Sequence, residues 1–376
     1  MNEIALSPPQ SAGELICIEY VPRQGLLALS LVNFALGLLT LTIYRFWAKT
    51  SVRRHIWSCV HINGQPLEYT GRGIELFLGA LVVFAIFGLP AIIVITAISI
   101  IYGPDHPAIA GVQMLLFLLV AVLWGAAVYR ARRYQLSRTL WRGIRGTLAG
   151  SSLTYSLTYF GALLARGMTL GWSTPVMNLN LQEMMIGDMR FGDRPFRFKG
   201  RAGPLYPSYA LCWVLTIVAI VAVLAGIIGG IFGTGLSQTF SDIFSETKEP
   251  AGSQVATVVI AFLAAYVLLG AIYSVIWSFY SARELRIFAG YTSFGNARFS
   301  MDATAGNLVG LVIGNLLIWI FTLGIGSPYV RQRLVRYLCE RIKVKGTVDV
   351  DHIAQSQAPL GKTGEGLADA FDVGGI

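Results

Sequence analysis

Long apolar stretches alternate with short polar ones along most of the chain. Four of them exceed the roughly 20 residues that a helix needs to cross the hydrocarbon core of a bilayer. They lie at residues 76–101, 108–129, 209–232 and 256–280. No aspartate or glutamate interrupts any of the four. This pattern predicts four transmembrane helices.

Three further apolar stretches are shorter and contain glycine, and they lie at residues 25–44, 153–172 and 305–326. Each ends in a related motif, which is TLTIYRFW, TLGWSTPV and TLGIGSPY in chain order. Thr169 and Thr322 lie 153 residues apart, and the glycine and proline that follow them keep this spacing. The first copy matches through Thr40 and the leucine after it. We interpret the motif as the centre of an internal repeat, which constrains the fold more than a single motif does.

A polar stretch of helical length follows each motif, and a short turn signal follows the stretch. The turn segments are HINGQPLEYTG, MRFGDRPFRFKG and RIKVKGTVDV, and alternation around a glycine predicts a small β-hairpin in each. We divide the chain into repeat 1 (1–145; hairpin 25–44, spans 76–101 and 108–129), repeat 2 (146–290; hairpin 153–172, spans 209–232 and 256–280), a partial repeat 3 (291–353; hairpin 305–326) and a disordered tail (354–376).

The composition agrees with a membrane protein, because 55% of the residues are hydrophobic and only 13% are charged. The net charge is +9, but the basic residues are scattered beside the apolar stretches, which is typical of cytoplasmic loops rather than of nucleic-acid binding. The first 20 residues lack the charged and apolar regions of a cleavable signal peptide. Four widely spaced cysteines form no CxxC pair, so we expect neither disulfides nor a zinc site.

The distribution of basic residues sets the expected topology. The linkers at 103–107 and about 233–255 contain almost no Lys or Arg. If all seven apolar segments crossed the bilayer, half of the basic clusters would lie on the other side, against the positive-inside tendency. We therefore expect an all-α polytopic membrane protein with four full spans, three re-entrant or shallow helical hairpins, small cytosolic β-hairpins and both termini in the cytoplasm. Seven full spans is the alternative.

At this point the motifs resemble a known family. The segment NFALGLLTLTIYRFWAKTSVRRHIWSCVHINGQPLEYTG, together with TLWRGIR, MTLGWSTP, FTLGIGSPYVRQR and GEGLADAFDVGG, resembles the YjgN family of bacterial inner-membrane proteins. The resemblance covers nearly the whole chain and implies a location in the bacterial inner (cytoplasmic) membrane. It implies no activity, because the family is a domain of unknown function. The first motif departs from the pattern, with Thr42 in place of glycine and Phe46 in place of proline.

Several polar residues of the three hairpin segments are candidates for a functional role. Arg166 lies inside the middle segment, where it can line a polar cavity or hold an anion, or can extend to the headgroups. Asn33 and Asn315 occupy matching positions and can bond across the repeats or to freed backbone, a structural role. The threonines Thr40, Thr169 and Thr322 are expected to bond backbone at the helix ends.

Amphipathic basic stretches suit the anionic inner leaflet. The arginines that we expect to contact lipid headgroups are Arg53, Arg54, Arg132, Arg133, Arg142, Arg145, Arg331 and Arg333. The chain has no phosphate-binding loop, no GxSxG elbow and no histidine pair with metal spacing. We expect no catalytic residue, metal or cofactor, and hence no enzyme.

Two functions remain from the sequence. A small-solute transporter or channel is the first hypothesis, because broken helices place polar backbone at membrane depth. A non-enzymatic scaffold or assembly factor, which binds partners or anionic lipid through its cytosolic modules, is the alternative. The expected partners are membrane lipid and a possible small solute, without nucleic acid, and the sequence does not indicate an oligomeric state. The tail contains LADAF, which is an alternative candidate for a docking peptide.

Overall fold

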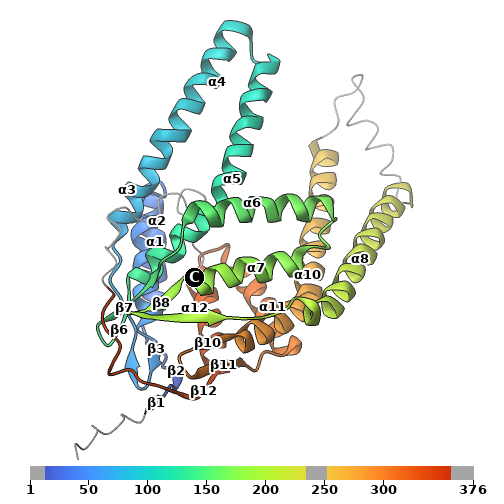
Figure 1. Ribbon diagram of the computed structural model, residues 1–376. Helices are drawn as coiled ribbons and strands as arrows, with labels where there is room; N and C mark the ends of the chain where they lie inside the picture. Colours follow the sequence, from blue (N-terminus) through green and yellow to red (C-terminus); the bar gives the residue numbers. More distant parts are fainter. Residues whose placement is uncertain (1–12, 234–251, 357–376) are drawn as a thin grey trace, which may run out of the picture. The chain divides into compact units, whose positions relative to one another are not determined.

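The computed structural model describes residues 13–233 and 252–356 (Figure 1). The chain forms two compact units, and each is described here by itself. The first unit comprises residues 1–202, 288–302 and 325–376, and the second comprises residues 203–287 and 303–324. The linker expected at about 233–255 lies largely outside the described residues, as does the expected tail from residue 357 onward.

The first unit opens with short strands, a helix pair and further strands. These elements are β1 (Glu14–Leu15), β2 (Ile18–Tyr20), α1 (Leu26–Leu39), α2 (Arg45–Trp57), β3 (Val60–Ile62), β4 (Gln65–Pro66) and β5 (Glu68–Tyr69). A long helix follows, made of α3 (Gly73–Val83), a π-helical turn (Phe84–Gly88) and α4 (Leu89–Tyr102). Pro90 explains the turn, because a proline ring clashes with the carbonyl four residues earlier in a regular α-helix. The helix α5 (Pro107–Ser137) leads back to the strands.

The second copy of the pattern continues the first unit. Its elements are β6 (Thr139–Trp141), β7 (Ile144–Leu148), α6 (Ser152–Met168), α7 (Thr174–Gly187), β8 (Met189–Phe191) and β9 (Arg194–Phe198). The second unit holds a 3₁₀ turn (Gly203–Leu205), α8 (Tyr206–Gly233), most of α10 (Gly252–Tyr291) and α11 (Ala305–Thr322). The remaining elements of the first unit are β10 (Thr292–Phe294), β11 (Ala297–Met301), α12 (Ser327–Arg341), β12 (Ile342–Lys345) and β13 (Thr347–Val348).

The element boundaries keep the spacing of the motif. The elements β6, β7, α6, α7, β8 and β9 each begin 153 residues before β10, β11, α11, α12, β12 and β13. The elements α2, β3 and β4 each begin 129 residues before α7, β8 and β9, which is also the distance from Thr40 to Thr169. The same order of elements thus recurs at constant spacing along the chain.

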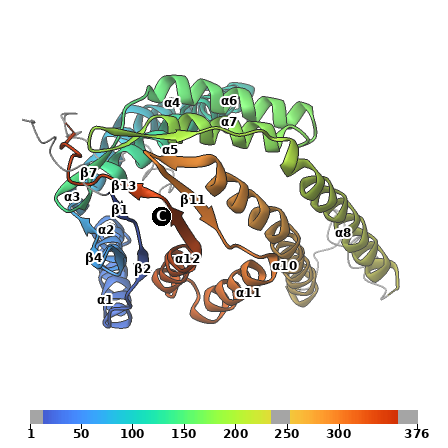
Figure 2. The same ribbon diagram turned by 60° about the horizontal axis from the view of Figure 1, so that its bottom comes forward.

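The strands of the first unit form a closed circuit. Eight of them, β5 to β12, pair in chain order as one antiparallel sheet. The circuit continues through Gly346 to β13, which pairs with β1, and then through β2, β3 and β4 back to β5. Figure 2 shows the strands with α2, α7 and α12 around them.

One apolar core lies inside this circuit. Its buried members come from β6, β10, β11, β13 and the segment after β13, and they are Trp141, Phe294, Ala297, Val348, Val350 and Ile353. Side chains from the other strands pack against them, among them Ile62, Phe191 and Val344. Strands of two to five residues have little stability alone, so this shared core holds the circuit together.

The expectation of an all-α protein with separate β-hairpins needs correction, because the chain is mostly helical but has a sizeable sheet. Two of the three expected hairpins are present, β3–β4 with the turn Asn63–Gly64 and β8–β9 with Gly192 at positive φ. The third, expected in RIKVKGTVDV, is not a hairpin, because β12 pairs with β11 and β13 pairs with β1. Neighbouring hairpins also pair with one another, as Gly146 opposite Phe191 and Thr292 opposite Phe198 illustrate. Sequence patterns report the turn within a hairpin but not the partner of its outer strand.

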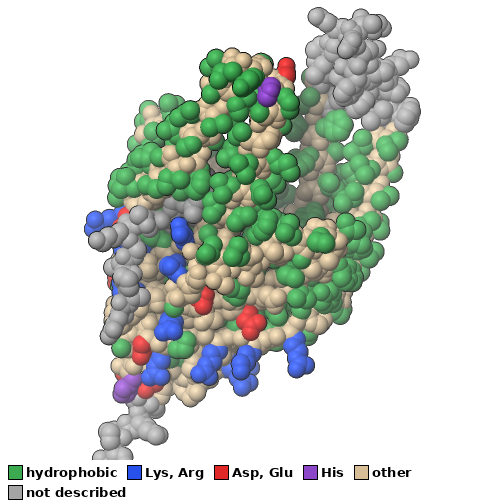
Figure 3. Space-filling view, turned by 45° about the horizontal axis from the view of Figure 1, so that its top comes forward, with side chains coloured by type: hydrophobic (Ala, Val, Ile, Leu, Met, Phe, Trp, Pro, Cys, Tyr) green, Lys and Arg blue, Asp and Glu red, His purple; other side chains and the backbone are tan. Residues whose placement is uncertain are grey.

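Five helices of the described residues are long and apolar enough to cross a membrane, one more than the four expected. The first two contain the predicted stretches 76–101 and 108–129, the next two overlap 209–232 and 256–280 with shifted ends, and the fifth is α11. The five segments are Gly73–Tyr102, Pro107–Ser137, Gly203–Gly229, Val259–Tyr291 and Ala305–Thr322. In the first unit, hydrophobic side chains cover α4 and α5, whereas Lys and Arg gather toward the strands (Figure 3).

The segment after β13 closes one end of the circuit. Val350 and Ile353 are buried in the core. Ala354 exchanges hydrogen bonds with Asp193, as its N–H donates to the carboxylate (3.2 Å) and its carbonyl accepts from the Asp193 N–H (3.1 Å). Gln355 donates to the carbonyl of Gly143 at 2.8 Å. The first residues of the expected tail, 354–356, thus take part in the fold.

Helices α5 and α6 cross with their backbones in close contact. An added Cβ at Gly125 would lie 2.6 Å from Tyr159 Cβ and 2.8 Å from Ser156 Cα. Ser156 donates from its hydroxyl to the carbonyl of Val122 and accepts from the N–H of Ala126 at 3.2 Å. Small residues and hydroxyl bonds of this kind favour helix association within membranes.

We expect Gly125→Ala to lower stability by about 1–3 kcal/mol, the typical cost of inserting an atom into a packed contact. Gly111→Ala, on the same helix with nothing within 4 Å of its added Cβ, is the matched control and should cause no loss. Thermal unfolding of the detergent-solubilised chain measures both. Equal melting temperatures for the two variants would contradict the close crossing.

The pairing of β1 with β13 joins the two ends of the described chain, and Glu14 ties it to two turns. Its carboxylate accepts from Arg142 at 3.1 Å and from the Asn63 side-chain amide at 3.1 Å. The hydrogen bond from Arg142, followed by that from Asn63, holds the pKa of Glu14 below its ordinary value.

A carboxyl group whose pKa is lowered on folding stabilises the folded state above its unfolded pKa, and this contribution disappears as the pH falls through the folded pKa. We therefore expect Glu14→Gln to destabilise the chain at neutral pH and to approach wild-type stability below about pH 4. Melting temperatures across pH 3–8 test this. A difference between the two chains that stays constant with pH would argue against the ion pair as its cause.

Candidate functional site

Each of the three motifs forms the same helix-ending turn. In the first copy the Leu41 N–H donates to Leu38 O (3.3 Å), and the Thr42 N–H donates to Gly37 O (2.7 Å). The pairs Leu170 to Gly167 and Gly171 to Arg166 repeat this pattern, as do Leu323 to Ile320 and Gly324 to Trp319. This is the Schellman arrangement, in which a left-handed residue lets the chain leave the helix.

The motif threonine completes the turn with its side chain. The hydroxyls of Thr40, Thr169 and Thr322 donate to the carbonyl four residues earlier, at 2.7, 2.7 and 2.6 Å. The hydroxyls of the first two also accept from the backbone N–H four residues later, that of Tyr44 at 3.0 Å and that of Ser173 at 3.1 Å. The threonine thus links the end of one helix to the start of the next.

The leucine after each threonine lies at the tip of its turn and is exposed. Leu41, Leu170 and Leu323 have φ angles of 47°, 50° and 49°, and their exposed fractions are 85%, 78% and 90%. A non-glycine residue at positive φ costs conformational energy. The chain therefore holds a strained, exposed, apolar side chain at the same place three times. Sequence reasoning concentrated on polar residues and missed this one, although the leucine is common to all three motifs.

The first motif forms the same turn as the other two, although it has Thr42 in place of glycine and Phe46 in place of proline. Thr42 adopts φ 71°, close to the 86° of Gly171 and the 87° of Gly324. Phe46, which stands where the other copies have proline, is buried against Leu76. The β-branched Thr42 thus occupies a conformation that favours glycine.

Two of the predicted polar residues, Asn33 and Arg166, bond within their own helix pairs. Asn33 on α1 donates to the hydroxyl of Ser51 on α2 at 3.2 Å. Arg166 on α6 donates to Asn178 Oδ1 on α7 at 2.5 Å. Asn315 on α11 has a buried Oδ1 that finds no hydrogen-bond partner among the described residues.

At least five of the eight arginines expected to contact lipid make contacts within the protein, Arg54 among them. Arg53 is only 2% exposed and donates to the Tyr69 hydroxyl at 3.3 Å, so its side chain is not available to headgroups. Arg133 donates to the carbonyl of Gly150. Arg142 pairs with Glu14, and Arg145 donates to Ser356 O at 2.9 Å.

Arg54 and the three remaining arginines keep at least part of their surface accessible. Arg54 donates to the carbonyl of Gly71 at 3.3 Å but is an exposed residue, as is Arg132. Arg331 and Arg333 on α12 are half-buried. These four stay candidates for contact with anionic groups.

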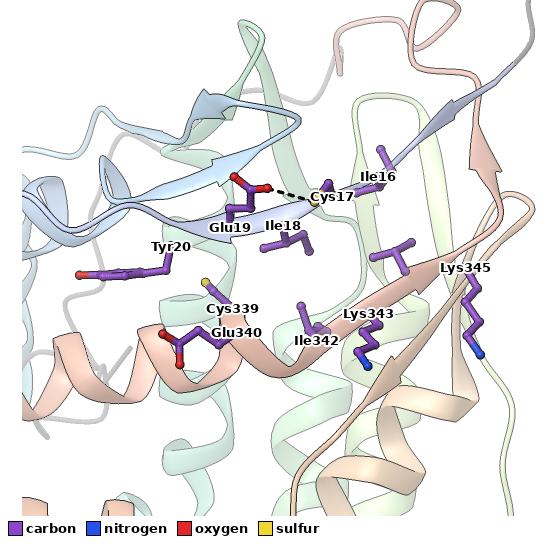
Figure 4. Close-up of a pocket in the computed structure, with 11 residues that line it drawn as sticks. Ile16, Cys17, Ile18, Glu19, Tyr20, Cys339, Glu340, Ile342, Lys343 and Lys345 are labelled. Atoms are coloured by element: carbon purple, nitrogen blue, oxygen red, sulfur yellow. Dashed lines mark hydrogen bonds between the residues drawn. The ribbon is translucent and has the colours of Figure 1, made fainter.

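A groove in the first unit was not expected from the sequence. It has a volume of about 680 Å³ and is lined by residues 16–20 and by residues 339–345 except Arg341. The strands β2 and β12 contribute to it, and each is the last strand of its sheet. Figure 4 shows Ile18 and Ile342 pointing toward one another across this space.

Three titratable side chains of the groove have pKa values above their ordinary ones. Burial raises the pKa of the Cys339 thiol to about 11, so it stays protonated at neutral pH. A hydrogen bond with Glu19 raises the pKa of the exposed Cys17. Burial raises the pKa of the Tyr20 phenol to about 12. Within residues 13–233 and 252–356, no group of three His, Cys, Asp or Glu residues could hold a metal ion. The groove can accommodate an apolar or extended segment.

Comparison with known proteins gives one family and two curated relatives. The family model described as "Bacterial protein of unknown function (DUF898)" matches residues 23–370. The chain is 24% identical to "Inner membrane protein YjgN" of Salmonella typhimurium over 371 residues, which covers 88% of each chain. It is 32% identical to "Inner membrane protein YjgN" of Escherichia coli O157:H7 over 159 residues, 41% of this chain and 37% of that protein. No solved structure matches.

Because Thr42 occupies a left-handed conformation, we expect Thr42→Gly to raise stability by about 1 kcal/mol, and Gly171→Thr to lower it by at least as much. The two substitutions are opposite changes at equivalent positions, so each controls the other. Thermal or denaturant unfolding in detergent measures both. A loss of stability in Thr42→Gly would mean that the threonine side chain contributes a contact that outweighs its strain.

Proposed function

The chain belongs to the family of bacterial proteins of unknown function DUF898, and we propose that it is a non-enzymatic inner-membrane scaffold, whose strand circuit is a cytosolic platform. Membership agrees with the YjgN resemblance of the motifs. Both curated relatives are named inner membrane proteins, and five described helices have the length and apolarity of spans. These findings support placement in the bacterial inner membrane.

The observation that carries the proposal is the exposed leucine at the tip of each motif turn. At all three positions the chain has a leucine where a glycine would remove the strain of the positive φ angle. The leucine side chain itself therefore has a function there. An apolar side chain exposed at the end of an apolar helix gains free energy by entering the acyl region. We infer that the motif segments enter the membrane from the cytoplasmic face and return, with both termini in the cytoplasm.

The helix that follows each tip supports this topology. The helices α2 and α7 pack on the strands β5 and β9, and α12 packs on β2. A helix that continues from a membrane-inserted tip to a strand fixes the platform close to the bilayer. We infer that the repeated boundaries mark a module of two strands, two helices and two strands, present in three copies. Each copy supplies an anchor and a part of the platform.

The transporter hypothesis is the second candidate, and one observation favours it. The π-helical turn Phe84–Gly88 interrupts the regular hydrogen bonds of a candidate span, and such turns are frequent at functional sites. Against it, no aspartate or glutamate lies in the predicted spans 76–101 or 108–129, and the described groove lies among strands. The scaffold therefore has the stronger support.

The depth of the tips tests the proposal directly. We expect a fluorophore on Leu170→Cys, in a chain with Cys17→Ser, to be quenched several-fold more by acyl-chain spin labels than by a water-soluble quencher. Glu183→Cys, an exposed position on α7 of the same hairpin, is the matched control and should show the reverse preference.

If the water-soluble quencher acted more strongly than the acyl-chain spin labels at both positions 170 and 183, the anchoring model would be wrong. Proteoliposomes that accumulate or release a small solute through the chain, in a manner that Glu183→Cys does not affect, would replace the scaffold with the transporter. Retention of defined partners by membranes that contain the full chain, without solute flux, is the result expected of a scaffold.

A further inference from the structure

The outward face of the eight-stranded sheet carries a row of basic residues. Ser293 on β10 lies opposite Arg197 on β9 and opposite Arg298 on β11, and Arg298 lies opposite Lys345 on β12. Residues directly opposite in an antiparallel sheet point to the same face. All three basic residues are exposed, while neighbours such as Phe196 and Val344 pack against the core. We call Arg197, Ser293, Arg298 and Lys345 the basic row.

The basic row contains a pair of like charges in direct opposition. Like charges directly opposite in a sheet are destabilising, and Arg298 and Lys345 are such a pair. None of the acidic residues within the described ranges forms an ion pair with Arg197, Arg298 or Lys345. By contrast, Lys343 on the same strand is paired with Asp302 at 2.5 Å. An anionic group bound along the row would offset this repulsion.

The groove adjoins the basic row, because Lys345 belongs to both. Ile18 and Ile342 face each other in the groove, and Val344 also lines it. The strands β2 and β12 each leave one edge without a strand partner among the described residues. An occupant that combines apolar side chains with negative charge therefore suits this surface.

The chain itself contains a segment with this chemistry. Residues 357–376 carry three acidic residues, Glu365, Asp369 and Asp372, against one basic residue, Lys362. Leu367 and Phe371 lie among the acids and supply apolar side chains. The family model extends to residue 370, well past the last described residue. The segment therefore belongs to the pattern that defines the family.

The attachment point of this segment lies within reach of the basic row. Ser356 accepts a hydrogen bond from Arg145 on β7, which is five strands from β12 in the same sheet. At a strand spacing of about 4.8 Å, this corresponds to roughly 24 Å. The eight residues from 357 to 364 span up to about 26 Å when extended. Glu365 and the residues after it can thus lie anywhere along the row.

We propose that the acidic C-terminal segment, residues 357–376, docks on the basic row and the adjoining groove of its own chain. Its carboxylates neutralise Arg197, Arg298 and Lys345, and Leu367 and Phe371 enter the groove beside Ile342. The docked segment covers the free edge of β12 and occupies the surface that a partner would use. This inference does not depend on the membrane role proposed above.

Photo-crosslinking of the full-length chain in nanodiscs tests the docking. We expect p-benzoyl-phenylalanine in place of Ser293 to crosslink to the tryptic peptide that follows Lys362. The same residue in place of Glu68, exposed on the opposite edge of the sheet, is the matched control and should give none. Neutralising the segment with Asp369→Asn and Asp372→Asn should reduce the yield at position 293 at least fivefold.

Variants of the basic row show whether a lost crosslink results from the lost positive charge or from misfolding. Arg298→Gln with Lys345→Gln should reduce the crosslink at least fivefold, whereas Arg298→Lys with Lys345→Arg should retain it. Equal melting temperatures of the two double variants show that both fold. A crosslink yield that is the same in the neutral and the charge-retaining variant overturns the proposal.

Mixing isotopically labelled and unlabelled chains identifies the origin of the docked segment. Crosslinks within one isotopic form are the expected result. Mixed crosslinks would assign the segment to a second copy and overturn docking within one chain. Crosslinks from position 293 to lipid or nucleic acid, with none to residues 363–376, would overturn the choice of occupant.

Discussion

The first unit depends on an apolar core that no single copy of the repeat can form. Its strands have two to five residues, and a strand pair of this length has marginal stability in water. Trp141, Phe294 and Val348 come from three parts of the chain and are buried together in one cluster. The contacts that close the strand circuit, Glu14 opposite Val348 and Ala354 with Asp193, are far apart in sequence. The strand circuit can therefore close only after almost the whole chain has been made, which is typical of slow, non-local folding.

The helices impose a different constraint on the same chain. A helix in lipid needs no distant partner to satisfy its backbone, so the candidate spans can form as soon as they are inserted. Each motif turn joins an apolar helix to a helix that packs on the strands. Local bonds of the motif threonine fix each turn, and they do not depend on the core. We infer that helices and turns form first and hold the strands near one another until the circuit closes.

This difference also explains which features the sequence predicts. Hydrophobic length predicts four of the five candidate spans, and motif spacing predicts the order of the elements, because both are local properties. The eight-stranded sheet was not predicted, since the pairing of β7 with β8 joins strands that a helix pair separates. The burial of Arg53 was also missed, because an arginine on a basic helix has the same sequence signature whether it faces lipid or Tyr69. The recurrence of Leu170 in all three motifs was visible in the sequence, but its positive φ angle was not.

The basic residues that give the chain its net charge of +9 fall into three groups with different roles. Arg53 and Arg145 are structural, because they bond Tyr69 and Ser356 within the first unit. Arg54 and Arg132 stay exposed near the ends of helices, where a positive charge favours the cytoplasmic side of a bilayer. The basic row belongs to neither of these two groups. Its residues lie on the outward face of a sheet and form no ion pair among the described residues. A charge pattern that neither the fold nor the membrane requires is best explained by a bound anion, and the acidic segment attached at Ser356 is the anion that is always present at high local concentration.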